Sequence, residues 1–194
     1  MRGEIMEDPV FAVFHRETSQ VIYKSILTLV DVQEINALLV GRESGWEDGA
    51  TGLATGIRPF LGLDLEKDLP DLIPHVKVVL RDYFPDLEVS TDARFYNHQL
   101  GSVKPHVDGN RDGKSNYTLL LYLGSDFEGG RLSIKMRRSN TELLESEPNK
   151  YHKVFTFEPL PGWGVIFHKS LLHWATEVID GNKNFLLLHL HSEF

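Results

Sequence analysis

From Val89 onward the sequence is a succession of short apolar runs separated by turn residues, and this pattern limits the fold more than any other feature. Eight of the runs have the length and the β-branched and aromatic content of strands. They span residues 92–98, 103–108, 116–123, 130–135, 152–157, 163–168, 172–178 and 184–191. Eight such strands can close two sheets around a pocket, so the pattern favours a jelly roll. The charged segment 135–150 is expected to be a solvated loop between strands.

The residues before Pro85 are expected to be helical. Asp31 and Glu34 resemble a capping pair that opens a helix, which Gly41 would end. A second helix is predicted near residues 72–83, where apolar side chains recur at helical spacing. The glycine-rich stretch 43–64 lacks periodicity and is predicted to be mostly a mobile loop or a plain surface connector.

These elements predict a mainly β (α+β) chain that forms one domain over residues 1–194. Residues 1–88 would supply helices packed on one sheet together with the loop, and residues 89–194 would form the jelly-roll core. A length of 194 residues with 41% hydrophobic content is sufficient for one core.

Composition excludes several classes of function. The chain has no cysteine, which excludes disulfides, zinc-thiolate sites, iron-sulfur clusters and a cysteine nucleophile. It also permits a reducing compartment, so we expect the protein to be cytoplasmic. A formal net charge of -8 argues against broad contact with nucleic acid or anionic lipid. No apolar run is long enough to span a bilayer, and charged residues interrupt the first sixteen positions where a signal peptide would lie.

One group of residues indicates a metal centre. His106 and Asp108 are two positions apart, so on a strand they would share a face and could bind one metal, and His173 follows 65 residues later. Two histidines and one carboxylate on one face of Fe(II) leave three positions open. A chelating cosubstrate and O2 can occupy those positions together, whereas a purely structural site would close them.

The surrounding residues resemble the Fe(II)- and 2-oxoglutarate-dependent dioxygenases, and within them the prolyl-hydroxylase-like branch. The resemblance runs from Arg94 to His191, and its elements occur in the expected order. They are Tyr96 ten residues before His106, Tyr122 in Tyr-Leu-Gly, Gly129-Gly130, Phe167 six residues before His173, and Gly181-x-Lys183. The resemblance implies a double-stranded β-helix, a cupin-like jelly roll, with iron held by His106, Asp108 and His173.

The resemblance also implies cosubstrate contacts. Lys183 matches the basic residue that binds the distal carboxylate of 2-oxoglutarate, and Tyr96 and Tyr122 match positions that line the cosubstrate pocket. A buried carboxylate needs a cation, and the Tyr122 hydroxyl could share it. Taken alone, Lys183 would more simply be a surface lysine in a turn, but its ten-residue offset from His173 favours the cosubstrate role. Ascorbate is expected to support activity.

His168 is the principal competitor of His173, since it also ends an apolar run, but only His173 gives Lys183 the expected offset. Strand alternation adds candidates for substrate or supporting contacts. Arg94 and His98 share a face with Tyr96, and His189 shares one with Lys183, although the plain end of a strand is an equal explanation for His189. By the same alternation Leu186, Leu188 and Leu190 should pack outward against neighbouring layers. Arg131 is a weaker candidate. Trp174 should point opposite to His173, into the core.

The function implied is hydroxylation of an amino-acid side chain, with a prolyl residue of a protein or peptide first and a free amino acid or other small molecule as the alternative. A nucleic-acid demethylase is disfavoured because no arginine follows His173. A non-catalytic jelly-roll module is disfavoured by the intact ligand set. Asp108 favours hydroxylation over halogenation, since halogenases have a small residue there. Residues 43–64 or 109–115 could close over the site.

Overall fold

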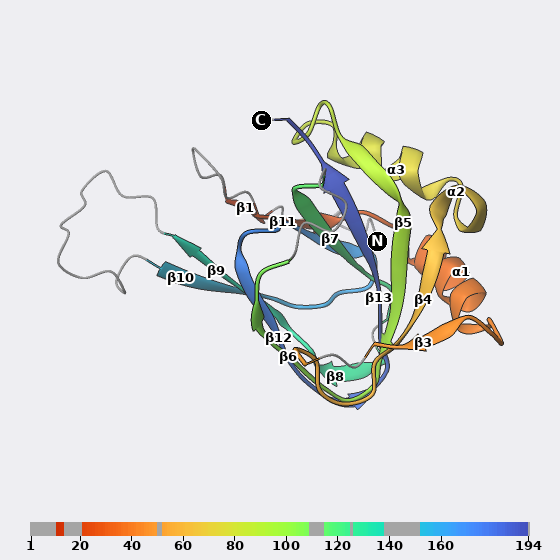
Figure 1. Cartoon of the computed structure of the whole chain (residues 1–194). Coiled ribbons are helices and arrows are strands. Elements are labelled where there is room, and N and C mark those ends of the chain that lie inside the picture. The colour runs from red at the N-terminus through yellow and green to blue at the C-terminus, as the bar shows by residue number, and fades with distance from the viewer. Residues whose placement is uncertain are drawn as a thin grey trace, which may run out of the picture.

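The computed structural model describes residues 11–13, 21–49, 52–108, 115–124, 126–137 and 152–193. In these residues the strands form two antiparallel sheets (Figure 1). The larger sheet has the order β1 (Phe11–Val13), β2 (Val21–Ser25), β11 (Trp163–His168), β7 (Tyr117–Tyr122), β13 (Lys183–His191), β5 (Glu88–His98), β4 (Pro59–Asp64), β3 (Trp46–Asp48). The smaller has the order β10 (His152–Phe157), β9 (Leu132–Arg137), β12 (Leu172–Gly181), β6 (Gly101–His106), with β8 (Phe127–Gly129) also paired to β12. The predicted jelly roll is confirmed. The expectation that residues 1–88 supply only helices and a loop was wrong, because β1 to β4 of the larger sheet come from this part of the chain.

Each predicted strand corresponds to an observed one, with shifts at the ends. The largest shift is at the start of β5, which begins at Glu88 and not at residue 92. The strand predicted at 103–108 lies two residues too late, because β6 begins at Gly101 and ends at His106, which leaves Asp108 beyond it. β9 and β10 form a hairpin that extends away from the helices (Figure 1), and most of the predicted loop 135–150 lies outside the described residues.

The helices cover the outer face of the larger sheet. Figure 1 shows α1 (Leu29–Val40), α2 (Leu65–Asp68) and α3 (Leu72–Leu80) together beside β4 and β5. In α3 the buried residues are Leu72, Val76 and Leu80, which recur every four positions and so form one apolar stripe. Leu186, Leu188 and Leu190 of β13 belong to this same core cluster, which confirms that they point outward toward the helices. None of the helices in the described residues has the length and apolar character needed to cross a bilayer.

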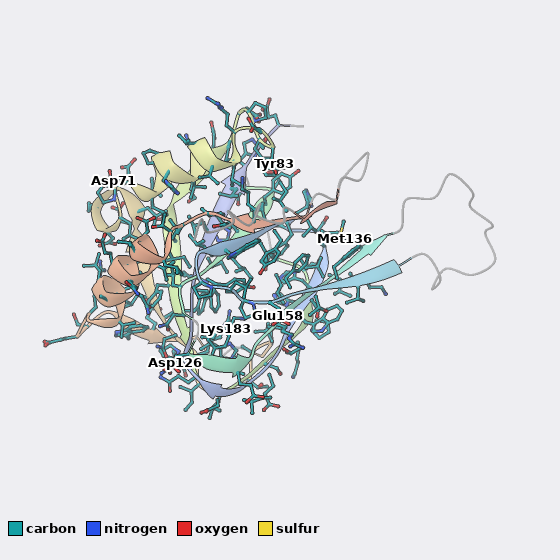
Figure 2. All side chains as sticks on the ribbon, turned by 180° about the vertical axis from the view of Figure 1, so that it is seen from behind. Asp71, Tyr83, Asp126, Met136, Glu158 and Lys183 are labelled. Carbon is teal, nitrogen blue, oxygen red and sulfur yellow. The ribbon has the colours of Figure 1, made fainter. Side chains whose placement is uncertain are left out.

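A second core fills the space between the two sheets. It joins Tyr96, Tyr122, Phe167 and Phe185 of the larger sheet to aliphatic residues such as Ile134 of the smaller one. Figure 2 shows side chains filling the interior, with the labelled Met136 on the side of the β9–β10 hairpin and Asp71 on the helical side. Because β13 contacts one core on each face, its central residues Phe185–Leu188 form a continuous apolar run and do not alternate.

The N-cap of α1 differs from the predicted one. The cap is Thr28, whose side chain accepts a hydrogen bond from the Asp31 backbone N–H at 3.2 Å, while Asp31 Oδ2 accepts one from the Thr28 backbone N–H at 2.9 Å. Asp31 therefore occupies the N3 position of the capping box and is not the N-cap, and Glu34 lies outside the box. The capping box expected from the sequence lies three residues too late, because Asp31 stands at the N3 position, where Glu or Gln is usual.

The prediction of a mobile loop at residues 43–64 was wrong. This stretch supplies β3 and β4, which extend the larger sheet beyond β5. Between them the backbone is tied to the neighbouring turn by Thr55 N–H to Ser102 O (2.9 Å), Lys104 N–H to Leu53 O (2.8 Å) and Gln99 N–H to Ile57 O (2.9 Å). Two of its glycines, Gly49 and Gly56, allow close backbone packing, since a Cβ there would lie 2.2 Å from Arg58 O and 2.0 Å from Leu100 O. A lid role for this segment is therefore not supported. Most of the other candidate lid, 109–115, lies outside the described residues.

Two glycines make this attachment possible. Gly56 and Gly101 have positive φ angles of 84° and 93°, a conformation that is costly for residues with a Cβ. A Cβ on Gly56 would lie 2.0 Å from Leu100 O, and one on Gly101 would lie 2.1 Å from Thr55 O. Glycine at both positions therefore lets residues 52–58 pack directly on the β5–β6 turn.

The corrected N-cap gives a stability prediction. Thr28→Ala should lower the free energy of unfolding by about 1 kcal/mol, because it leaves an N-terminal N–H of α1 without its acceptor. Glu34 was expected from the sequence to belong to the capping pair. Glu34→Ala should change the free energy of unfolding by less than about 0.5 kcal/mol. Urea denaturation followed by circular dichroism measures both, and the opposite ranking would refute the observed capping box.

Candidate active site

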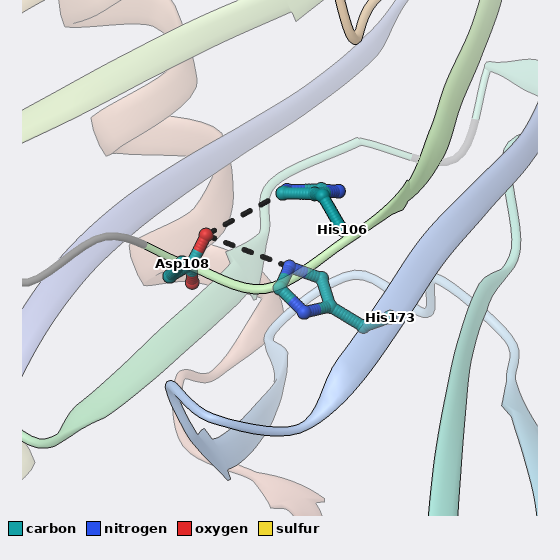
Figure 3. A group of neighbouring side chains, drawn as sticks. All are labelled: His106, Asp108 and His173. Carbon is teal, nitrogen blue, oxygen red and sulfur yellow. Dashed lines mark ion pairs between the residues drawn. The ribbon is translucent and has the colours of Figure 1, made fainter.

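His106, Asp108 and His173 meet at one point between the sheets. Each offers one metal-binding atom, and these atoms lie within 4.8 Å of one another. Asp108 Oδ1 is 3.6 Å from Nε2 of His106 and 3.6 Å from Nε2 of His173, and Figure 3 shows the three side chains pointing toward one another. The last residue of β6, His106, is the cross-strand partner of His173 in β12, so sheet pairing itself brings the two imidazoles together.

Backbone contacts orient both imidazoles for metal binding. The Nδ1 atom of His106 is 2.8 Å from Lys104 O, and the Nδ1 atom of His173 is 2.9 Å from Leu171 O. A carbonyl oxygen can only accept, so each Nδ1 carries the proton and donates it. Each Nε2 is then left with a free lone pair directed at the common centre, which is the arrangement that metal-ligating histidines adopt.

Asp108 is held by the larger sheet. Its Oδ2 accepts a hydrogen bond of 2.7 Å from Thr118 Oγ1 in β7, and its backbone N–H donates to Lys169 O at 3.1 Å. The sequence argument that placed Asp108 on the same strand as His106 was therefore wrong in detail, because tertiary contacts and not strand geometry position the carboxylate. With Oδ2 occupied, Oδ1 is the oxygen that remains for a metal.

The electrostatics of the three residues suit a divalent cation. Burial is the main cause that lowers the pKa of His173 from its ordinary value, and the Asp108 carboxylate partly opposes it. A lowered pKa keeps this imidazole neutral, which is the form that binds metals. Two neutral nitrogens and one carboxylate oxygen fit Fe(II) with three positions left for other ligands.

His168 lies outside this group. Its Nδ1 is 2.7 Å from Ser170 Oγ, and its ring packs edge-on against Tyr117 at 5.3 Å between centroids. His168 is the residue that pairs with Tyr117 across β11 and β7, whereas His173 is the second residue of β12, on the opposite sheet. The structure thus brings His173 and not His168 to Asp108.

Lys183 is a buried cation in the same pocket. Its side chain is 3% exposed, its Nζ donates to Gly130 O, and Nζ lies 5.2 Å and 5.3 Å from the ring centres of Tyr122 and Phe185. Burial, with a smaller effect of the nearby Arg58 charge, lowers the pKa of Lys183 to about 7. Among the described residues, the buried Tyr122 hydroxyl has no hydrogen-bond partner. The buried cation, with the Tyr122 ring against it, fits the distal carboxylate of 2-oxoglutarate. Tyr122 and Tyr96 themselves are not among the described residues that line the pocket.

Gly130 is required for this placement of Lys183. Its φ is +65°, and a Cβ there would lie 2.8 Å from Lys183 Cδ. The Gly129-Gly130 pair noted in the sequence therefore has a local physical role, since only glycine leaves room for the lysine stem beside the Gly130 carbonyl.

Tyr96, His98 and Arg94 share the inner face of β5, as predicted. The Tyr96 ring stacks on Phe185 at 5.0 Å, with an interplanar angle of 16°, and Arg94 Nη1 is 3.5 Å from the Tyr96 hydroxyl. His98 lines the pocket beside Lys183, its partner across the sheet. Burial, with the charges of Arg58 and Lys183, lowers the pKa of His98 to about 4, so this imidazole is neutral at physiological pH.

Three other sequence candidates have different surroundings. Arg131 forms an ion pair of 2.7 Å with Glu158 in which both side chains are 55% exposed, and it does not line the pocket. His189 pairs with Thr118 across the sheet but is also absent from the pocket lining. Trp174 does line it, against the prediction of core packing. The register of β12 with β6 shifts between His173 and Ala175, and such a bulge breaks the alternation on which that prediction rested.

Two polar residues at the pocket were not predicted from the sequence. Thr118 holds Asp108, and its alternation with Leu120 and Tyr122 in β7 could have revealed that it faces inward. Arg58 lines the pocket with the metal-binding residues and Lys183. No local signal identified it, because the stretch around it was expected to be a loop.

Comparison with solved structures shows which proteins share this fold. A 2OG-Fe(II) oxygenase family oxidoreductase from Burkholderia pseudomallei is 12% identical, with a TM-score of 0.62 over 88% of this chain and 85% of that one. A Pseudomonas putida prolyl-4-hydroxylase is 14% identical, with a TM-score of 0.60 over 90% and 93%. A Trichoplax adhaerens prolyl hydroxylase, solved with a hypoxia inducible factor peptide fragment, is 12% identical, with a TM-score of 0.65 over 90% and 84%. No protein-family model and no curated protein sequence matches the chain. The chain has the fold of the 2OG-Fe(II) oxygenases.

The two histidines provide a test of the metal site. His173→Ala should weaken binding of Mn(II), used as an oxygen-stable substitute for Fe(II), by about 100-fold or more, since one of three ligands is lost. His168→Ala should leave the affinity within about threefold, because its ring contacts Tyr117 and Ser170 instead. Isothermal titration calorimetry measures both affinities. Loss of binding in the His168 variant alone would show that His168, and not His173, is the third ligand.

Proposed function

We propose that this protein is an Fe(II)- and 2-oxoglutarate-dependent dioxygenase that hydroxylates a C–H bond of an amino-acid side chain. The observation that carries the proposal is the convergence of His106, Asp108 and His173 in a pocket whose other end holds the buried Lys183. A prolyl residue of a protein or peptide is the first candidate substrate, which the prolyl hydroxylases among the structural neighbours support. A free amino acid or other small molecule is the second, and the pocket charges discussed below favour it.

In this proposal the protein residues have separate roles. The two histidines and Asp108 would hold iron, which when bound supplies the means to activate O2 and oxidise 2-oxoglutarate to succinate and CO2. Lys183 and the Tyr122 hydroxyl would fix the distal carboxylate of the cosubstrate. Thr118 keeps Asp108 in one orientation, and the apolar wall that includes Phe185 and Leu187 excludes water from the reacting atoms. Ascorbate would keep the iron reduced.

The other classes have less support. The acidic net charge opposes the broad phosphate contacts of a nucleic-acid demethylase. A non-catalytic binding module would have no need for an open ligand set together with a buried lysine. A reducing compartment such as the cytoplasm suits Fe(II) and is the proposed location.

Turnover of the cosubstrate tests the enzyme class without knowledge of the substrate. Purified protein with Fe(II), ascorbate and 2-oxoglutarate should form succinate slowly, and Asp108→Ala should abolish this, because the metal loses its carboxylate. Mass spectrometry detects the succinate. A chain that neither forms succinate nor binds 2-oxoglutarate would rule the proposal out.

The pKa of Lys183 predicts the pH dependence of cosubstrate binding. The charged lysine is the form that binds a carboxylate, and with a pKa of about 7 it is charged below pH 7 and neutral above it. The affinity for 2-oxoglutarate should therefore fall by about tenfold per pH unit from pH 7 to 9. Calorimetry with the Mn(II)-loaded protein measures this fall.

Lys183→Arg is the matched control, because arginine stays charged over this range. Its affinity, whatever its absolute value, should be nearly constant between pH 7 and 9. An equal decline in both proteins would show that Lys183 does not control the pH dependence.

A further inference from the structure

Arg58 has no role in the activity proposed above, yet it lies in the same pocket. It precedes β4 and lines the cavity together with His106, Asp108 and Lys183. Its Cζ is 4.2 Å from the centre of the Tyr96 ring, so the guanidinium stacks on that ring. Its Nε is shielded from solvent and, within the described residues, has no hydrogen-bond partner.

Leaving this cation unpaired is costly for the folded protein. Burial is the main cause that lowers the pKa of Arg58, and the Arg94 charge acts in the same direction, while Tyr96 and the Asp108 carboxylate oppose it. In the part of the chain that the structure describes, neither Arg58 nor Arg94 forms an ion pair. Buried charges in proteins are normally paired, so a guanidinium with an open donor indicates a place for an anion that none of the described residues supplies.

The charges of the pocket point in the same direction. Asp108 is the one acidic side chain among the described residues that line it, whereas Arg58 and Lys183 are both cationic. A divalent metal and doubly charged 2-oxoglutarate cancel each other, and Asp108 balances only one of the two cationic side chains. One positive charge is left, and one further anionic group would neutralise it.

Arg58 is also fixed in place before any ligand binds. Ile57 O accepts a hydrogen bond of 2.9 Å from Gln99 N–H, and the preceding residues are tied to the β5–β6 turn, as described above. On the other side Phe60 pairs with Tyr96 across β4 and β5, and Arg94 lies 5.1 Å above the Phe60 ring. The two arginines therefore both contact Tyr96, Arg58 over its ring from the residue before β4 and Arg94 at its hydroxyl from β5 itself. This preorganised arrangement lowers the entropic cost of binding.

We infer that Arg58, assisted by Arg94, binds a carboxylate or phosphate group of the substrate, so that the substrate is a small anionic molecule such as a free amino acid. The planar guanidinium fork suits either anion, and an internal residue of a polypeptide lacks such a group on its backbone. This inference rests on the proposed function and selects the second of its two candidate substrates. Lys183 remains the cosubstrate anchor, and Arg58 recognises the second anion.

The first measurement separates Arg58 from the cosubstrate site. N-oxalylglycine, an unreactive analogue of 2-oxoglutarate, is titrated into the Zn(II)-loaded protein. Lys183→Met should weaken its binding by about 30-fold or more, as expected for loss of a buried charge partner, whereas Arg58→Gln should stay within about threefold. Equal losses would place Arg58 in the cosubstrate site and overturn the inference. Near-normal binding by the Arg58 variant also shows that it is folded.

The second measurement detects the proposed anion directly. The protein is first saturated with Zn(II) and N-oxalylglycine. NMR then follows the Arg58 Nε–H resonance during titration with acetate, inorganic phosphate and neutral acetamide. The resonance is assigned by its loss in Arg58→Gln. Acetate or phosphate should shift this resonance saturably, and acetamide should not. Arg94→Gln should weaken the binding of the anion that causes the shift several-fold. The anion that binds more tightly identifies the substrate group as carboxylate or phosphate.

The outcomes distinguish the inference from the function on which it rests. A resonance that responds to neither anion, or equally to acetamide, overturns the inference while normal N-oxalylglycine binding leaves the proposed function intact. Failure of the wild-type protein to bind N-oxalylglycine would instead remove the proposed function, and the inference with it.

Discussion

The cross-strand pairing of His106 with His173 is the constraint on which the rest of the site depends. Because β6 and β12 are adjacent in the smaller sheet, their backbone hydrogen bonds fix the separation of the two imidazoles. Each ring is then turned by a hydrogen bond from its own Nδ1 to a carbonyl two residues earlier. The larger sheet adds Asp108 through Thr118, so the metal site joins the two sheets at the pocket. Its geometry is therefore as rigid as the jelly roll itself.

The pocket also concentrates charge that the protein does not neutralise. Lys183 lines the pocket from β13, and Arg58 lines it from the position before β4. His98 lies on β5 between them, and burial together with the charges of both cations lowers its pKa. A folded protein tolerates such a cost where ligands supply the missing charge. Stacking on Tyr96 and Phe185 partly offsets the cost for Arg58, since aromatic faces attract cations. A pocket that favours anions is thus a direct result of how its walls are built.

Sequence reasoning succeeded where the information is local. Strand periodicity located all eight predicted strands of the jelly roll, and the outward direction of Leu186, Leu188 and Leu190 followed from alternation alone. It failed where distant segments decide the structure. Residues 43–64 look irregular because glycines such as Gly56 allow close backbone packing, which resembles flexibility in a sequence. Trp174 was misplaced because a register shift against β6 interrupts the period of two.

The sequence by itself determined the fold class and the chemical identity of the candidate ligands, His106, Asp108 and His173, with Lys183 beyond them, because strand alternation and motif spacing are written along the chain. Only the tertiary structure decided that Thr118 orients Asp108, that Trp174 lines the pocket and that Arg58 lies beside the candidate metal site. Those three facts depend on contacts between strands far apart in sequence. Such contacts are set by packing and by bulges, and no local pattern records them.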